Sequence, residues 1–251
     1  FGARGERPTH PELLDWLAIR FKESGYSIKA MHRLIMHSAA YQRSSQYDAE
    51  AGEKDPDSRL LWRFNRRRLS SEEIRDAMLF VSGNLDLTRG EQHPFPPVET
   101  WGFTQHTPFY AVYPTNQRSV YLMQQRLKRH PFLALFDGAD TNVSTARREL
   151  TTVPTQALYL MNNEFVHEQA TRFSRRLSGE AKHESERIER AYQIVFGRSA
   201  GADELTEATD FLASYRQAAA TAVRLQSERE QMAWDAFART LLTRNEFLFV
   251  D

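Results

Sequence analysis

Cysteine is missing from this 251-residue chain, and its absence excludes disulfides, thiolate metal ligands and covalent attachment of haem within it. Long apolar runs are missing too, because no stretch approaches the roughly 20 apolar residues that a membrane-spanning helix needs. Net charge is also missing, since 33 Lys and Arg residues face 33 Asp and Glu residues. A neutral chain has no general attraction for nucleic acids or anionic membranes. We therefore expect no nucleic-acid partner and no membrane insertion.

The composition that is present is typical of a soluble globular protein, with 41% hydrophobic and 26% charged residues. The length suffices for one large domain or two small ones, and for a real core. The chain starts at Phe1 without an initiator Met, so we expect a piece of a longer protein, truncated at its N-terminus. We predict one mainly helical domain over residues 1–251, with a helical part at 1–90, an irregular core segment at 91–150 and a helical part at 151–251.

A helical hairpin is predicted over residues 9–43. Thr9 and Glu12 have the spacing of a capping box at the start of the first helix, and Ser27 caps the second. Apolar residues recur at helical spacing in both helices, which predicts that these faces point inward. They are Leu13, Leu14, Leu17 and Phe21 in the first helix, and Ile28, Met31, Ile35 and Ala39 in the second.

The clearest local pattern covers residues 70–83. Ser70 and Glu73 form a second capping-box pair, and Gly83 follows as a stop signal. Between them, apolar residues occur at i, i+3, i+4 and i+7, which predicts a helix buried along one face. These residues are Ile74, Ala77, Met78 and Val81.

Residues 84–117 are irregular, because repeated prolines prevent long helices there. Their aromatic residues favour one or two short strands, and residues 119–123 are a further strand candidate. The same aromatic residues are interpreted either as core or as a surface that stacks on sugars. They are Trp101, Phe103, Phe109, Tyr110 and Tyr113.

Helical periodicity returns after Pro131 and dominates the C-terminal part. A short helical turn is predicted at residues 132–136, and a longer helix from Pro154 to about residue 177, broken near Asn162 and Asn163. Further amphipathic helices are predicted around residues 188–196, 205–215 and 234–242. The predicted fold class is therefore mainly α, with a central irregular segment and room for a small β element.

Charged residues within residues 115–166 alternate with large apolar ones, unlike the pattern of an exposed face. Buried charges are costly unless they are paired, so we expect at least two of these arginines to bond Asp137, Asp140 or backbone carbonyls. The cluster is interpreted either as a structural ion-pair network or as a pocket for an anion or an acidic sugar. It comprises Arg118, Arg126, Asp137, Asp140, Arg147 and Arg148.

Other chemistry is weakly signalled. Asp137 and Asp140 are candidates for a glycosidase-type carboxylate pair, although neighbouring arginines would keep both ionised. None of the eight histidines has the helical spacing of two metal ligands. His93 and His106 are a weak metal-site candidate of another kind, in which both meet an aspartate in space. The Arg66–Arg68 run, with Arg59, Arg63 and Arg75, is interpreted as a solvated or ion-paired face rather than a phosphate site. We expect no metal and no cofactor in this chain.

Several blocks of the sequence resemble an uncharacterised C-terminal domain (domain of unknown function, DUF1553 type) of multidomain proteins from Planctomycetes and related bacteria. The blocks are THPELLDWLA at 9–18, IKAMHRLIMHSAAYQRSS at 28–45, RRLSSEEIRDAMLFVSGNLD at 67–86, RSVYL at 118–122, LFDGAD at 135–140, TTVPTQALYLMNNEFV at 151–166 and the ending LLTRNEFLFVD. One departure is Ala200-Gly201, where the family has Pro-Thr. The resemblance implies an exported bacterial protein, periplasmic or on the cell surface, with haem held by a separate upstream c-type cytochrome domain.

We therefore predict a non-catalytic binding or assembly domain. Its expected partners are other domains of the same polypeptide, or an acidic or carbohydrate ligand. The alternative is an enzyme, a polysaccharide-directed hydrolase or a redox-associated protein, that uses the cluster of arginines and aspartates. A solvent-open pocket at the cluster would favour a ligand site, and a dry, fully paired network would favour a structural role.

Overall fold

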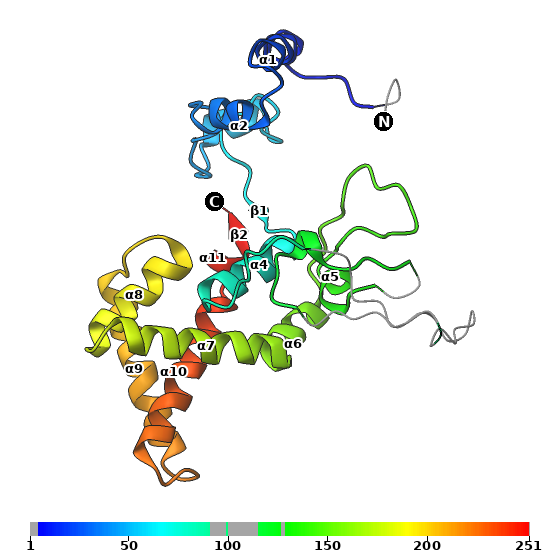
Figure 1. The fold of residues 1–251 in the computed structure, drawn as a ribbon. Helices are drawn as coiled ribbons and strands as arrows, with labels where there is room; N and C mark the ends of the chain where they lie inside the picture. Colours follow the sequence, from blue (N-terminus) through cyan, green and yellow to red (C-terminus); the bar gives the residue numbers. More distant parts are fainter. Residues whose placement is uncertain (1–4, 91–98, 100–114, 127–128, 251) are drawn as a thin grey trace. The chain divides into compact units, whose positions relative to one another are not determined.

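The computed structural model describes residues 5–90, 99, 115–126 and 129–250 (Figure 1). The described chain is mainly helical, with one two-stranded sheet of β1 (Arg67–Arg68) and β2 (Phe249–Val250), which confirms the predicted fold class. The chain divides into two compact units. Unit 1 consists of Phe1–Arg67 and Phe249–Asp251, and unit 2 of Arg68–Leu248. The prediction of a single domain over residues 1–251 stays a prediction.

Unit 1 contains α1 (Pro11–Glu23), α2 (Ile28–Met36) and α3 (Ala49–Lys54), and α1 packs against α2 as the predicted hairpin. Ser27 caps α2 as predicted, because its side chain accepts a hydrogen bond from the backbone N–H of Ala30. The loop after α3 is held by Asp55, whose carboxylate accepts from the backbone N–H groups of Arg59 and Leu60 at 3.0 and 2.7 Å.

Two expectations for unit 1 are wrong. The first helix begins at Pro11 with His10 as its N-cap, and the Thr9 hydroxyl contacts the His10 ring instead of capping the helix. The apolar stripes of the hairpin are also not buried: α1 and α2 contain no buried residue, and Leu14 and Ile28 are 56% and 63% exposed. Periodicity identified the helices correctly, but two short helices alone offer too little surface to cover their own apolar faces.

Unit 2 begins with α4 (Ser71–Val81), which confirms the strongest local prediction. Ser70 caps the helix, and both hydrogen bonds of the capping box with Glu73 are present. Ile74 and Met78 are fully buried, and Val81 is 3% exposed. The inward face of α4 thus packs into the core. Residues on the opposite side of α4 form one wall of the cavity described below.

The elements of secondary structure described in the middle of unit 2 are short. The 3-10 helix η3 (Ser119–Tyr121) replaces the strand proposed for residues 119–123, so that expectation is wrong. An isolated parallel bridge joins Asp86 to Gln117. The short helix predicted after Pro131 is present as α5 (Pro131–Leu135). Two predictions concern residues outside the described ranges. They are the stacking or core role of Trp101, Phe103, Phe109, Tyr110 and Tyr113, and the metal role of His93 and His106.

The predicted broken helix is confirmed as α6 (Pro154–Asn162) and α7 (Glu164–Glu180), which follow one another in Figure 1. The break falls at Asn163, which ends α6 in an extended conformation and caps α7 by accepting from the Phe165 N–H at 2.9 Å. An asparagine favours this position because its side chain satisfies a backbone donor that a helix start leaves open.

The C-terminal helices are α8 (Glu184–Phe196), α9 (Ala202–Ala219), α10 (Gln226–Leu242) and α11 (Asn245–Leu248). Gly197 ends α8 with φ +70°, a left-handed conformation that glycine adopts without steric cost. The helix α10 packs against α7 and α9. The core of unit 2 lies between these helices, where Phe173, Leu177, Leu212, Leu241 and Leu242 are all completely buried.

Candidate functional site

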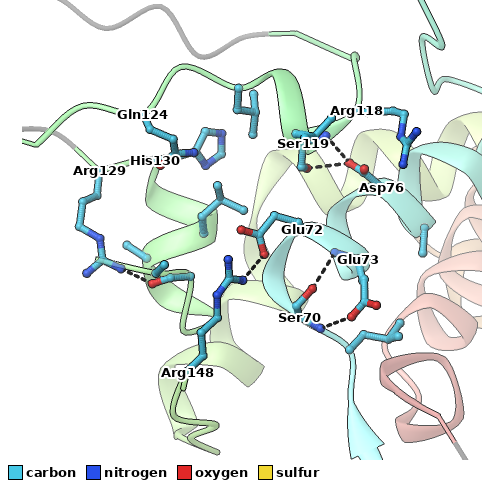
Figure 2. Close-up of a pocket in the computed structure, with 18 of the residues that line it drawn as sticks. Ser70, Glu72, Glu73, Asp76, Arg118, Ser119, Gln124, Arg129, His130 and Arg148 are labelled. Carbon is cyan, nitrogen blue, oxygen red and sulfur yellow. Dashed lines mark hydrogen bonds and ion pairs between the residues drawn. The ribbon is translucent and has the colours of Figure 1, made fainter. Parts of the chain in front are cut away.

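A cavity of about 990 Å³ lies in unit 2 between α4, η3, α5 and the loop after α5 (Figure 2). Its size is at the upper end of the range of small-molecule sites, which is roughly 300–1,000 Å³. Apolar side chains such as Leu122, Leu133 and Phe80 form much of the wall. Polar and charged residues complete the lining: Ser70, Glu72, Glu73, Asp76, Arg118, Ser119, Gln124, Arg129, His130, Asp140, Thr141 and Arg148.

Three of the four acidic side chains of the cavity, all but Asp140, come from α4. Glu72 accepts a hydrogen bond from Arg148 at 2.6 Å. Asp76 accepts from both the backbone N–H and the hydroxyl of Ser119, at 2.8 and 2.6 Å (Figure 2). Both carboxylates therefore hold neighbouring segments against α4, which leaves them less available to a ligand.

Two arginines on the other segments complete the charged part of the wall. The Arg129 side chain donates to the backbone carbonyl of Gly138 at 2.6 Å. Arg118 is exposed, and its side chain makes no ion pair or hydrogen bond with any residue that the structure describes. Because a guanidinium carries five N–H donors, both residues retain donors that a ligand can use.

His130 also lines the cavity, at the start of α5, and its imidazole is held in the neutral form. Burial, and then the positive charge of Arg75, lower the pKa of His130 to about 4. A neutral imidazole offers one donor and one acceptor nitrogen at physiological pH.

A smaller depression of about 330 Å³ adjoins this cavity and shares Arg129, Asp140 and Arg148 with it. It adds Asp137 and Arg147 from the sequence-predicted cluster. The two depressions together are thus lined by every member of that cluster except Arg126.

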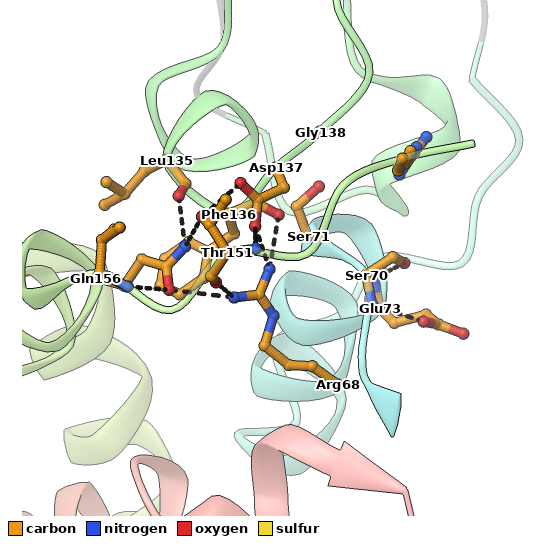
Figure 3. A network of polar contacts seen from close by, with 12 residues as sticks. Arg68, Ser70, Ser71, Glu73, Leu135, Phe136, Asp137, Gly138, Thr151 and Gln156 are labelled. Carbon is orange, nitrogen blue, oxygen red and sulfur yellow. Dashed lines mark hydrogen bonds and ion pairs between the residues drawn. The ribbon is translucent and has the colours of Figure 1, made fainter. Parts of the chain in front are cut away.

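A buried polar network lies next to the smaller depression, which Asp137 lines (Figure 3). Arg68 donates to the Asp137 carboxylate at 2.5 Å, to the backbone carbonyl of Thr151 and to the side-chain oxygen of Gln156. Asp137 in turn accepts from the Thr151 N–H at 2.9 Å and from its hydroxyl at 2.8 Å. The Gln156 amide donates to the Leu135 carbonyl at 3.0 Å, so the network joins β1, the loop after α5 and the start of α6.

The backbone conformation of Asp137 and the charge of its carboxylate both hold it in this network. Its φ of +61° is left-handed, a conformation that aspartate tolerates better than most residues, and it turns the carboxylate back toward Thr151. At the next position a Cβ would lie 2.6 Å from the Leu133 carbonyl oxygen, so Gly138 is required. Partial burial raises the pKa of Asp137, but the hydrogen bonds from Thr151 and Arg68 outweigh it and leave the pKa below its usual value.

The structure corrects the pairing predicted for the cluster. None of Arg118, Arg126, Arg147 and Arg148 pairs with Asp137 or Asp140 or donates to a backbone carbonyl within the described residues. All four are exposed, and Arg148 pairs with Glu72 instead. Asp140 caps a local turn by accepting from the Asn142 N–H at 2.8 Å, which lowers its pKa. The loop 139–150 lies on the surface, so its charges are solvated and needed no buried partners.

Among the described residues, the buried arginines are Arg68 and Arg75, which the sequence assigned to a solvated or ion-paired face; Arg68 is ion-paired, with Asp137, but neither lies on a solvated face. Both are at most 7% exposed. Arg75 donates to the Gln117 carbonyl at 3.0 Å, to the Thr115 carbonyl and to the Ser119 hydroxyl at 3.1 Å. One signal was available for Arg75, because it directly follows Ile74 and precedes Met78 by three residues on the buried side of α4. No signal separated Arg68 from the two arginines before it.

No group of three or more potential metal ligands occurs within the described ranges. None of the helices in the described part of the chain is both long and apolar enough to cross a membrane.

These features define a mainly α-helical domain with a ligand-sized cavity beside a buried arginine network. The chain belongs to the family described as PSD1: Protein of unknown function (DUF1553), whose model matches residues 1–212. This match confirms the resemblance to a DUF1553-type domain over residues 1–212. Neither the comparison with curated proteins nor the comparison with solved structures found a match.

The depressed pKa of His130 makes stability dependent on pH. Since the unfolded imidazole titrates near 6.5 and the folded one near 4, only the unfolded state gains the proton between these values, and stability falls as the pH falls. Because His130 is only half-buried, we expect a loss on the order of 1–2 kcal/mol between about pH 7 and 4.5. The measurement is urea unfolding of the wild type and His130→Gln at both pH values. An equal loss in both proteins would contradict the prediction, because every other titrating group is shared.

Proposed function

We propose that this chain is a non-catalytic binding domain whose two adjoining depressions take a carboxylate-bearing ligand, such as an acidic saccharide. The observation that carries the proposal is the lining: arginines from separate segments, three of them exposed and Arg129 half-buried, surround depressions whose carboxylates are engaged apart from the exposed Glu149. These arginines are Arg118 before η3, Arg129 before α5, and Arg147 and Arg148 in the loop before α6. A guanidinium binds a carboxylate through paired, charge-assisted hydrogen bonds.

The charge balance of the lining supports an anionic group at this place. Glu72 is paired with Arg148, Asp137 with Arg68, and Asp140 accepts from the Asn142 backbone. By contrast, Arg118 and Arg147 make no side-chain ion pair or hydrogen bond with a described residue. An incoming carboxylate therefore meets available donors without displacing an internal partner.

The same contacts argue against the hydrolase alternative. A glycosidase needs one carboxyl group that is protonated when the reaction starts and a second that is ionised. The hydrogen bonds around Asp137 and Asp140 lower the pKa of both, so both are ionised near neutral pH. Such a pair lacks the general acid, and binding without catalysis fits these residues better.

The wider context of the proposal comes from the family resemblance. In that context the domain is exported, and it belongs to a multidomain polypeptide whose upstream c-type cytochrome domain holds the haem. Other domains of the same polypeptide are then natural partners, and the acidic ligand is the substrate or anchor that the whole protein recognises.

The test is calorimetric binding of hexagalacturonate to the wild type, Arg118→Gln and Arg147→Gln. Each variant removes a charge-assisted contact, so we expect affinity to fall about fivefold to tenfold, and wild-type binding to weaken with salt. Arg126→Gln is the matched control, because Arg126 is exposed on the same segment but lines neither depression. It should bind like the wild type.

Two results would overturn the proposal. One is wild-type protein that does not bind the acidic hexasaccharide, or binds it equally well in all three variants. The other is release of new reducing ends during incubation, abolished in Asp140→Asn, which would establish the hydrolase instead.

A further inference from the structure

A third cavity, of about 470 Å³, lies in unit 2 beside the first one, and His130 lines both. Its remaining lining comes from α4, the segment before η3, and the helices α5, α6 and α7. No residue of the sequence-predicted cluster contributes to it. It is therefore a separate place at which a ligand can be held.

Aromatic rings form one side of this cavity. Phe132 is buried, and its ring lies 5.6 Å from the ring of Tyr159 and 5.9 Å from that of Phe165, both edge to face. These contacts fix the orientation of Tyr159 and Phe165, which are only half-buried and keep part of their rings accessible. Rigid, partly accessible rings of this kind provide apolar faces for stacking.

Hydrogen-bonding groups form the rest of the lining. Asn116 donates through its amide nitrogen to Asn84 at 3.2 Å, and it is exposed. Glu168 lies at the rim and is exposed, with one carboxylate oxygen bonded to Arg172 at 2.9 Å.

The charges at this cavity are compensated. The Arg75 guanidinium is buried and donates to Thr115, Gln117 and Ser119, so it braces the wall instead of offering a free cation. The carboxylate of Glu168 is paired with Arg172. An ionic ligand would therefore find no matching charge here, unlike in the first cavity.

We propose that this third cavity binds a neutral, polyhydroxylated ring, such as one hexopyranose unit. The C–H face of such a ring stacks on Tyr159 and Phe165, while its hydroxyl groups exchange hydrogen bonds with Asn116 and Glu168. This site does not depend on the anionic site, because the two sets of lining residues share only His130 and suit ligands of different charge, one anionic and one neutral.

The experiment measures binding of cellohexaose, mannohexaose and xylohexaose by calorimetry and by saturation-transfer NMR. At least one of them should bind the wild type. Phe165→Leu, which keeps apolar volume but removes the ring, should weaken that binding about fivefold to tenfold. Glu168→Gln should weaken it less. Tyr41→Leu is the matched control, since Tyr41 is an exposed ring in unit 1 that lines none of the three cavities and should leave neutral-sugar binding unchanged.

Two outcomes would overturn the inference: no binding of any of the three neutral hexasaccharides, or binding that Phe165→Leu and Glu168→Gln both leave unchanged in correctly folded protein. Far-ultraviolet circular dichroism and thermal unfolding of each variant establish the folding. Hexagalacturonate binding separates the two proposals. Arg118→Gln should weaken only the acidic ligand and Phe165→Leu only the neutral one, so either site can fail alone.

Discussion

Replacing Asp137 with Asn should lower the free energy of unfolding by about 3–5 kcal/mol, because it leaves the buried guanidinium of Arg68 without its counter-charge. The side chains of this pair are 6% and 17% exposed, and the two residues lie 69 positions apart in the chain. The amide that replaces the carboxylate can still accept from Thr151, but it cannot neutralise Arg68. Urea unfolding followed by circular dichroism measures the loss.

Arg68→Met and the double variant complete a cycle that isolates the pair. We expect the two changes together to cost less than their sum by about 1–3 kcal/mol, since each single change strands a buried partner. The matched control is Glu72→Gln, which breaks a pair with Arg148 whose side chains are 30% and 39% exposed. That pair should contribute under about 1 kcal/mol. Equal effects of Asp137→Asn and Glu72→Gln would show that the Arg68 pair is not buried in solution.

Replacing Phe173 with Ala should cost about 3–5 kcal/mol, because the ring is fully buried and its removal leaves a cavity in the core. Phe173 lies in α7, which packs along α10, so the loss should weaken the packing around which the helices of unit 2 are assembled. The thermal midpoint and the urea midpoint of the variant both report this effect.

Phe80→Ala makes the same chemical change at a site that is 62% exposed. It removes a surface ring on α4 and leaves no internal cavity, so we expect a cost below about 1 kcal/mol. A similar loss of stability in Phe173→Ala and Phe80→Ala would contradict the assignment of Phe173 to the core, because burial would then not distinguish the two positions.

Local signals predicted the helices well wherever the cause of the structure is local. The capping box of Ser70 and Glu73, the stop at Gly83 and the break at Asn163 each depend on a few neighbouring residues. The Thr9 prediction failed under the same logic, because Pro11 favours the first helical turn and moves the start of α1 past the threonine. Such a shift of one residue, from Thr9 to His10 as the N-cap, is settled by competition between adjacent signals.

The candidate site was harder to predict, because it depends on which charges are buried. Five members of the sequence-predicted cluster line the two adjoining depressions. The sequence paired them wrongly, however, since the partner of Asp137 comes from 69 residues earlier in the chain. The aromatic cavity was not anticipated, because Phe132, Tyr159 and Phe165 lie on three different helices.

By itself the sequence determined the class of fold, the positions of several helix ends and the family, because periodicity, capping residues and recognisable sequence blocks are all encoded over short stretches. It also determined that cysteine chemistry is excluded. Only the tertiary structure decided that Arg68 and Arg75 are interior while the cluster arginines face solvent. The physical reason is that burial is set by which surfaces meet, and a guanidinium is kept inside only where distant segments supply acceptors for it.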